Sequence, residues 1–398
     1  MLERTYEYRL YPTRKQERNF DLLLDTTRAL YNGMLKDRTE HFRETGKWKR
    51  LNPEPIIKES LLMKELEASV VSWAVGNLER AFINFFRIRK TQINHYRPEA
   101  IRKAKKDPSY VLMDTDLAGY PKMKNKTAKG SIDMGSGKVL VTADRVNVPG
   151  VGNIKIRLHR PIPEKATIRH YTIVRKAAYE YYFLVHIEMP EPEKITELKS
   201  AMGIALEPGV LAQCSDGKPV LFRHESNAMK GKIARAYAKL QIKTPGSRQY
   251  EKQRLHLAVL NEKRKMQRRD SLHKISKRLV SKADYIILEE PRVQQKKKKL
   301  LRAGTFDTVL DEAWWTFSEY VRYKSCSAGK RFWRASGDIP IRNACSGCGI
   351  ILENIERNTK WECPYCGVRM PAELNAAKNL EHFGNLYIQE QQTLNTQK

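Results

Sequence analysis

The sequence predicts an α+β protein with several domains. Three observations lead to this class: the chain is longer than one hydrophobic core usually supports, strand-like and helix-like segments alternate in blocks, and two CxxC pairs lie near the C-terminal end. Hydrophobic residues make up 41% of the 398 residues and charged residues 30%, which is typical of a folded chain rather than a disordered one.

The first 110 residues are predicted to form one strand and then helices. Residues 5–10 alternate aromatic or apolar with charged side chains, and the alternation stops at Tyr11-Pro12. Apolar residues then recur at helical spacing over residues 22–34 and again over 78–86. Aromatic rings can stack on bases, but we expect the phenylalanines of the second stripe to belong to the core: Phe82, Phe85 and Phe86.

Residues 111–188 are predicted to form a small antiparallel barrel. Gly, Pro and Asn separate four short β-prone runs, at 139–141, 154–158, 166–168 and 181–185. The segment 189–192, Met-Pro-Glu-Pro, indicates a linker. Basic residues are expected along the edges of the barrel: Lys122, Lys124, Lys126, Arg157, His159, Arg160, Arg169 and Arg175.

An α/β pattern follows the linker. Residues 202–206 are a predicted strand that pairs with residues 220–222 through the turn at Asp216-Gly217, and residues 285–289 are a buried strand that ends in an acid. Helices are expected around 313–330 and 371–383, on either side of the CxxC pairs. We expect the two isolated cysteines to be small buried apolar residues: Cys214 and Cys326.

The other four cysteines form two CxxC pairs with 14 residues between the pairs: Cys345 with Cys348, and Cys363 with Cys366. Each pair can direct two thiolates at one ion, and the glycines that follow, Gly349 and Gly367, permit the positive φ that such a turn requires. Four soft ligands without a histidine favour a closed, structural Zn²⁺ site. A redox pair or an iron–sulfur cluster is the alternative.

The formal net charge of +29 requires an acidic partner, for which a nucleic acid is favoured over an anionic membrane surface. Residues 251–302 carry 17 Lys and Arg against 6 Asp and Glu. A long helix and a following loop are predicted there, with these phosphate-binding side chains: Arg264, Lys265, Arg268, Arg269, Lys274, Lys277, Arg278, Lys296, Lys297, Lys298 and Lys299. The chain has no apolar run of about 20 residues and no secretory signal, so we expect a cytoplasmic protein.

Over nearly its whole length, the chain resembles the transposon-encoded TnpB (OrfB zinc-ribbon) proteins and the miniature type V CRISPR effectors derived from them. The resemblance depends on the order and spacing of short motifs. Besides the CxxC pairs they are Tyr8-Arg9-Leu10-Tyr11-Pro12, Leu30-Tyr31-Asn32, Ala81-Phe82-Ile83-Asn84-Phe85-Phe86, Gly119-Tyr120-Pro121-Lys122, His159-Arg160-Pro161, His273-Lys274-Ile275-Ser276, Ala313-Trp314 and Asn375-Ala376-Ala377-Lys378-Asn379.

The resemblance implies a wedge-type β-barrel interrupted by a helical recognition lobe, then an RNase H-like (RuvC) α/β domain with an inserted four-cysteine zinc ribbon. It also implies a guide RNA and a double-stranded DNA target as partners, and a state that is either monomer or homodimer. The expected domains are a first wedge strand (1–12), the helical lobe (13–108), the wedge barrel (109–190), the RuvC-like domain (191–338), the zinc ribbon (339–370), and the last helix with its tail (371–398).

The family cuts DNA with two Mg²⁺ ions held by carboxylates from the first strand, a later strand and the last helix. The matching positions here are Ala205, Glu289 and Glu373, where the family has Asp at the first and third. Alanine offers no oxygen, and the longer Glu373 displaces its carboxylate by roughly 1–1.5 Å from the place that octahedral Mg²⁺ requires. Glu207 shares a strand face with Ala205 but lies roughly 6.5–7 Å further along, so we expect it to be a poor substitute.

We therefore expect an RNA-guided DNA-binding protein that has lost cleavage, with weak or no Mg²⁺ binding. It would act on transcription near the bacterial nucleoid, either by blocking RNA polymerase or by recruiting a partner such as a sigma factor. Two alternatives remain: a nuclease with altered metal geometry, and a guide-independent zinc-ribbon nucleic-acid-binding protein or RNA chaperone. The departures at positions 205 and 373 together favour natural loss of the site over an engineered inactivation.

Overall fold

A computed structural model of the chain divides into two compact units, residues 1–190 and 191–398, and the division falls inside the predicted linker. Each unit is described by itself. The structure describes residues 2–91, 96–107, 109–126, 129–135, 141–142, 144–176, 179–222, 227–291, 313–352 and 360–396.

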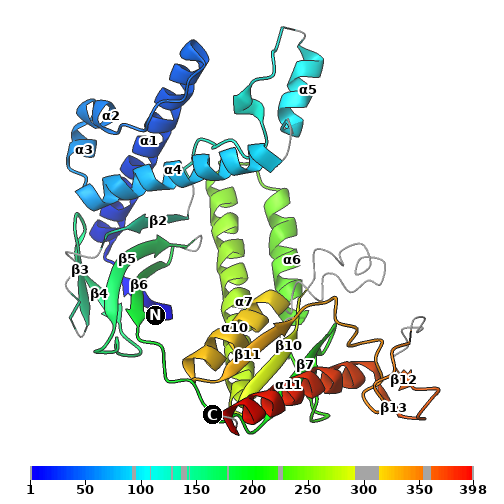
Figure 1. The fold of residues 1–398 in the computed structure, drawn as a ribbon. Helices are drawn as coiled ribbons and strands as arrows, with labels where there is room; N and C mark the ends of the chain where they lie inside the picture. The colour runs from blue at the N-terminus through cyan, green and yellow to red at the C-terminus, as the bar shows by residue number, and fades with distance from the viewer. Residues whose placement is uncertain are drawn as a thin grey trace. The chain divides into compact units, whose positions relative to one another are not determined.

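The first unit contains a six-stranded antiparallel sheet (Figure 1). Its N-terminal strand lies inside the sheet, where Tyr6, Tyr8 and Leu10 face the core and the residues between them do not. In sheet order the strands are β2 (Gly130–Asp133), β5 (Thr167–Arg175), β6 (Tyr181–Met189), β1 (Leu2–Tyr11), β4 (Gly152–Arg157) and β3 (Arg145–Val148).

The predicted strands at 154–158, 166–168 and 181–185 are confirmed as β4, β5 and β6. Most of the predicted strand at 139–141 lies outside the described residues. Its last residue, Val141, is described and forms an isolated bridge with Val146. Strands β2 and β3 were not predicted. Among the described strands they form the two edges of the sheet and do not pair with each other. The sheet is therefore an open half-barrel, whereas the sequence predicted a barrel.

The helices of this unit are built around α1 (Arg14–Thr45) and α4 (Ala68–Thr91), which pack against each other. Thr13 and Gln16 form a capping box at the start of α1, and Gly46 ends it in the left-handed conformation. Phe82 and Phe85 are buried here, as predicted, and Phe86 is partly buried. The remaining helices are α2 (Glu54–Lys58), α3 (Leu61–Lys64), α5 (Pro98–Lys106) and the 3₁₀ turn η1 (Asp114–Asp116).

The second unit contains a five-stranded mixed sheet in which β7 is central. The predicted pairing of 202–206 with 220–222 is wrong, because a further strand pairs with both and the turn at Asp216-Gly217 joins that strand to β9. In sheet order the strands are β11 (Arg331–Ala335), β10 (Tyr285–Glu289), β7 (Ala201–Glu207), β8 (Leu211–Cys214) and β9 (Pro219–Leu221); the first three are parallel.

Helices cover both faces of this sheet (Figure 1). The apolar face of α7, predicted from Leu272, Ile275 and Leu279, packs with α10 on one side. On the other side α11 lies against β7 and β10. The bounds are α6 (Asn227–Gln241), α7 (Arg248–Val280), α10 (Trp314–Ser327) and α11 (Ala372–Thr396), and a small hairpin pairs β12 (Lys360–Glu362) with β13 (Arg369–Pro371).

The two isolated cysteines differ in environment. Cys214 is fully buried in β8, as predicted. Cys326 is exposed, so that prediction is wrong. Its neighbour Ser325 faces the core, and one step along a helix rotates the next side chain by about 100°, which turns Cys326 away from it.

Gly203 sets the close approach of α11 to the sheet. A Cβ at Gly203 would overlap the carbonyl oxygen of Ala377 and the amide nitrogen of Glu381, both backbone atoms of α11. Because backbone atoms cannot move aside like a flexible side chain, any larger residue has to push the helix off β7.

Replacing Gly203 with Ala should therefore lower the free energy of unfolding by about 2–3 kcal/mol, measured by chemical denaturation. Gly231→Ala is the matched control. Gly231 lies in α6 with open space around its Cα, so the same change there should raise stability by about 0.5–1 kcal/mol. Equal effects at the two positions would contradict the close packing.

Candidate functional site

The structure brings the three predicted site positions to one end of the mixed sheet. Ala205 and Glu289 lie on adjacent parallel strands, and Glu373 lies in the first turn of α11. Ala205 is fully buried and packs in one apolar cluster with Ala376 and Ala377 of α11. Its methyl group is therefore part of the helix–sheet core.

Glu289 is buried at the end of β10, and its carboxylate reaches across to β7. The Leu206 amide donates a hydrogen bond of 3.0 Å to Oε2 of Glu289. This backbone contact holds the carboxylate beside Ala205, where the family resemblance places the first metal ligand. Glu373 is only partly buried.

An arginine that the sequence analysis did not single out lies between the two glutamates. The Arg342 guanidinium contacts Glu289 through both carboxylate oxygens, at 2.6 Å from Nη2 and 3.3 Å from Nε. Its Nη1 donates to Oε2 of Glu373, and its Nη2 donates to the Leu206 carbonyl oxygen at 3.0 Å. One side chain therefore joins β7, β10 and the start of α11.

The charges in this cluster depend on one another. Burial disfavours the charged form of Arg342, but Glu289 and Glu373 outweigh that effect and raise the pKa of Arg342 above its usual range. For Glu207, burial and the nearby Glu373 raise the pKa of its carboxyl group, while Arg342 lowers it by less. Glu207 therefore lies close to the cluster, with its charged form disfavoured.

These residues do not fit a pair of Mg²⁺ ions. Mg²⁺ is held by carboxylate oxygens at about 2.0–2.1 Å in near-octahedral geometry. Position 205 supplies no oxygen, and both remaining family carboxylates are engaged by the guanidinium of Arg342. Arginine stays protonated in proteins and donates without accepting, so it competes with a cation for the same oxygens.

The four paired cysteines converge as their spacing predicts. Their Sγ atoms all lie within 4.8 Å of one another, with 3.5 Å between Cys345 and Cys366 and 3.7 Å between Cys348 and Cys363. Four thiolates around one Zn²⁺ at about 2.3 Å would be separated by about 3.8 Å. The group could therefore hold a metal ion such as zinc.

The backbone around these cysteines supports the same geometry. Gly349 and Gly367 adopt φ of 76° and 71°, which confirms the predicted turns. Burial raises the pKa of the Cys345 thiol, but hydrogen bonds from the backbone of Cys348 and Gly347 and from the thiols of Cys366 and Cys363 outweigh it and lower that pKa. The same thiol contacts raise the pKa of Cys366, so the four thiols share their protons as a group. A thiol with a lowered pKa is readily available as a thiolate ligand.

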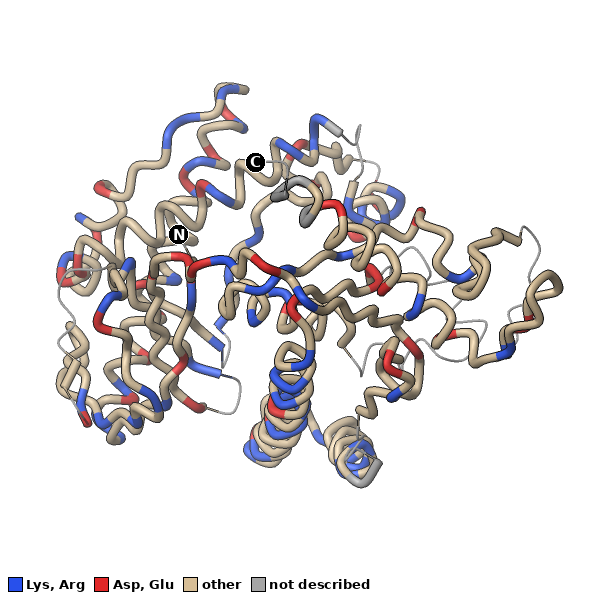
Figure 2. Tube along the Cα trace, turned by 60° about the horizontal axis from the view of Figure 1, so that its bottom comes forward, with Lys and Arg blue, Asp and Glu red and all other residues tan. Residues whose placement is uncertain are grey.

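The basic residues predicted on α7 are exposed or partly exposed. They follow the helix from its middle to its C-terminal end: Arg264, Lys265, Arg268, Arg269, Lys274, Lys277 and Arg278. Figure 2 marks the Lys and Arg positions along the described backbone in blue. Lys274 also pairs with Asp270 at 2.6 Å. The predicted basic loop, Lys296, Lys297, Lys298 and Lys299, lies outside the described residues.

In the first unit, not every predicted basic residue lies on an open edge. Arg175 is buried and pairs with Asp21, and Arg169 pairs with Glu188. The edge prediction is wrong for Arg175, because its position in β5 faces the core. The residues that remain exposed are Lys122, Lys124, Lys126, Arg157, His159, Arg160 and Arg169.

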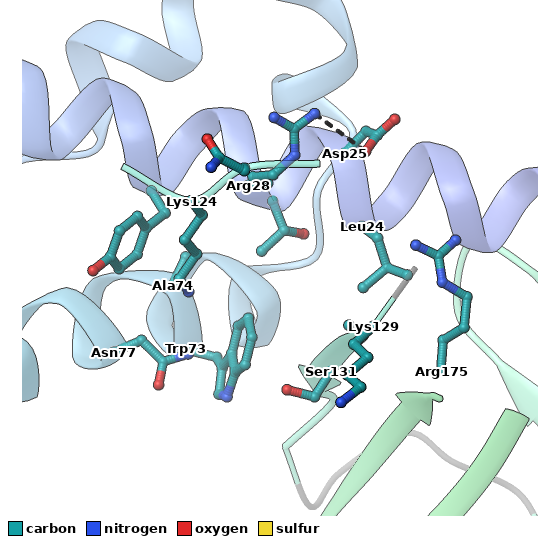
Figure 3. A pocket seen from close by; sticks show the side chains of 14 residues that line it. Leu24, Asp25, Arg28, Trp73, Ala74, Asn77, Lys124, Lys129, Ser131 and Arg175 are labelled. Carbon is teal, nitrogen blue, oxygen red and sulfur yellow. Dashed lines mark hydrogen bonds and ion pairs between the residues drawn. The ribbon is translucent and has the colours of Figure 1, made fainter. Parts of the chain in front are cut away.

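Lys124 lines a cavity of about 430 Å³ between α1, α4 and the start of β2 (Figure 3). Its Nζ lies 3.9 Å from the centroid of the Tyr31 ring and 5.6 Å from that of Trp73. Arg28 and the Asn77 amide also line the cavity (Figure 3). Cations, aromatic faces and an amide in one cavity are the groups that contact phosphates and bases.

Several motif residues that suggested the family have structural contacts. Asn32 forms two hydrogen bonds with the Lys124 backbone, at 2.8 Å to its amide and 3.0 Å to its carbonyl oxygen. The Arg160 guanidinium lies 3.6 Å from the centroid of the Tyr6 ring. Asn375 and Asn379 are buried and bind the backbone just before the first CxxC pair.

Three family models match parts of the chain. The model for residues 1–47 is described as a helix-turn-helix domain of the OrfB IS605 type, although these residues form β1 and the single helix α1 here. Residues 184–299 match the OrfB IS605 model described as "Probable transposase", and residues 314–380 match the TNB domain of Cas12f1-like proteins.

Whole-chain relatives agree with these matches. A Streptomyces pristinaespiralis protein that carries the name RNA-guided DNA endonuclease is 23% identical, covering 95% of this chain and 89% of its own. InsQ of Escherichia coli K12, which carries the same name, is 21% identical, covering 96% and 92%.

A solved structure, the Cas12f1–sgRNA–target DNA complex, matches with a TM-score of 0.51 at 12% identity, covering 93% of this chain and 83% of that chain. At this identity the match shows the fold alone. The predicted resemblance to the OrfB and Cas12f1-like proteins is confirmed. Separately, none of the helices among the described residues is long and apolar enough to cross a membrane.

Proposed function

We propose that this protein binds a guide RNA and a matching double-stranded DNA target and does not cut the target. The observation that carries the proposal is the contact of Arg342 with both remaining family carboxylates, next to an alanine at the first ligand position. Two-metal cleavage needs cations at the developing charge on the phosphate. A fixed guanidinium cannot polarise a bound water as Mg²⁺ does.

The nucleic-acid side of the proposal is supported by charge and by the relatives. The basic side chains of α7 and the cavity at Lys124 offer phosphate and base contacts in the two units. In RNA-guided systems the protein reads shape and a short motif, while base pairing reads the target sequence. A bound complex that leaves the DNA intact would act on transcription, by blocking RNA polymerase or by recruiting a partner such as a sigma factor.

The enzyme alternative is a nuclease that uses Glu207, Glu289 and Glu373. It is less favoured because the carboxyl pKa of Glu207 is raised and the other two carboxylates contact Arg342. The guide-independent alternative is less favoured because the fold match extends over the chain of a guide-bound effector and is not confined to the cysteine segment.

The first prediction of the proposed function concerns the target DNA. Protein purified with its bound RNA should bind a matching duplex and shift it in a gel, with an affinity that falls as the salt concentration rises. Both DNA strands should stay intact in the presence of Mg²⁺ or Mn²⁺. The comparison is a duplex with a scrambled target sequence, which should not shift. Site-specific cutting that Glu289→Gln abolishes would establish the enzyme alternative, and RNA of mixed sequence in the particle would favour the guide-independent one.

The second prediction concerns the cysteines. We expect one zinc ion per chain by metal analysis, and Cys348→Ser should lower the zinc content and destabilise the segment around it, because metal binding supplies folding free energy there. Cys326→Ser is the matched control, since Cys326 is exposed and outside the cluster. Unchanged zinc content in Cys348→Ser would contradict the zinc assignment.

The third prediction concerns the basic face of α7. The double change Lys265→Ala and Arg269→Ala removes two charges without weakening the helix, because alanine is a strong helix former. It should reduce the magnitude of the slope of log affinity against log salt concentration by about 1–2, for RNA or for target DNA. The control removes two charges elsewhere in the same unit, with Lys194→Ala and Lys218→Ala, both exposed. Equal losses in the two variants would show a general charge effect rather than a binding face.

A further inference from the structure

The segment that carries Arg342 leads directly into the first CxxC pair. Arg342 lies three residues before Cys345, and the segment around it is held by two buried side chains of α11. Asn375 Nδ2 donates to the Ala344 carbonyl oxygen at 2.7 Å, and its Oδ1 accepts from the Ser346 amide at 2.8 Å. Asn379 Nδ2 donates to the carbonyl oxygens of Ile341 and Ala344, both at 2.8 Å.

Residues 341–346, which lead into the four-cysteine segment, are therefore held by contacts on two sides. The asparagines of α11 bind their backbone, while Arg342 reaches in the other direction to Glu289 of β10 and the Leu206 carbonyl oxygen of β7. Ile341, the preceding residue, is buried in the apolar cluster that also contains Ala205. All these contacts lie within the second unit.

We propose that Arg342 is a fixed internal cation that occupies the place of the metal ions, and that Glu289 and Glu373 anchor the four-cysteine segment to the sheet and α11 through it. On this view Glu289 and Glu373 are positioning residues for the segment rather than metal ligands. The inference rests on the proposed function, because it applies to a site that does not cut DNA.

Charge and shape both favour this role. A guanidinium is planar, stays protonated and matches a carboxylate with two parallel donors, as it does at Glu289. Removing one member of such a buried group leaves the others without compensation, and this is far more harmful than replacing the pair together by apolar residues. The contact should therefore show strong coupling between its members.

The proposal also predicts that a carboxylate at the first position alone does not restore metal binding. An aspartate at position 205 would face the same guanidinium and would join the ion-pair group rather than hold Mg²⁺. Metal binding should return only when Arg342 is removed together with the change Ala205→Asp.

The test is a double-mutant cycle with Arg342→Met, Glu289→Leu and both changes together, in the full chain. Arg342→Met should lower the melting temperature by roughly 6–12 °C and speed hydrogen exchange at the amides of residues 341–346. The double variant should recover much of that loss. Arg369→Met is the matched control, because Arg369 pairs with Glu362 on the exposed hairpin of the same segment, and it should change neither readout.

A second measurement titrates Mn²⁺ and follows its paramagnetic resonance signal. The native chain and Ala205→Asp should bind no Mn²⁺ at this site, and Ala205→Asp with Arg342→Met should bind it. The anchor would be overturned if the stability effects of the two single changes were simply additive in the double variant. It would also be overturned if the native chain bound Mn²⁺ and Glu289→Gln lost it. Cutting is measured separately. Target cleavage with strong coupling in the cycle would contradict the proposed function, and with it the placement of Arg342 at the metal position, but not the anchoring contact. Weak coupling without cleavage would contradict only the anchor.

Discussion

One guanidinium, that of Arg342, contacts two buried or partly buried carboxylates and joins three elements of the second unit. Carboxylates at the end of β10 and the start of α11 would repel each other without a cation between them. In a two-metal nuclease the ions supply that charge. Here Arg342 supplies it from inside the chain, so the acidic residues are compensated whether or not a divalent cation is present.

The close packing of α11 on β7 makes this contact possible. Gly203 allows the helix to approach the strand, and Ala205, Ala376 and Ala377 fill the space between them with small side chains. This approach brings the first turn of α11, with Glu373, to the end of the sheet where Glu289 lies. The asparagines two and six residues after Glu373, Asn375 and Asn379, then bind the segment that leads to the cysteines. The same packing therefore brings both carboxylates within reach of the Arg342 guanidinium.

Much of the fold could be predicted from the sequence, because alternation marks β1, continuous apolar runs mark β7 and β10, and helical spacing marks the end of α7. Strand β8 was missed because its four residues include Gln213 and form neither an alternating pattern nor an apolar run, which led to the wrong partner for β7. The exposure of Cys326 was missed because residue type alone does not give its side of a helix. The cysteine cluster and the loss of the carboxylate at position 205 could be read from spacing and from family resemblance.

Arg342 could not have been predicted in the same way. No motif or periodicity marks it, and its partners lie 53 and 31 residues away in the sequence, on two different elements. Its role follows only from the fold that brings β10 and α11 together.

The decisive measurement is an experimental structure of the protein with its RNA and a matching target, prepared in Mn²⁺. We expect an intact target strand and the Arg342 guanidinium between Glu289 and Glu373. Mn²⁺ ions on those carboxylates, with a cut strand beside them, would contradict the role of Arg342.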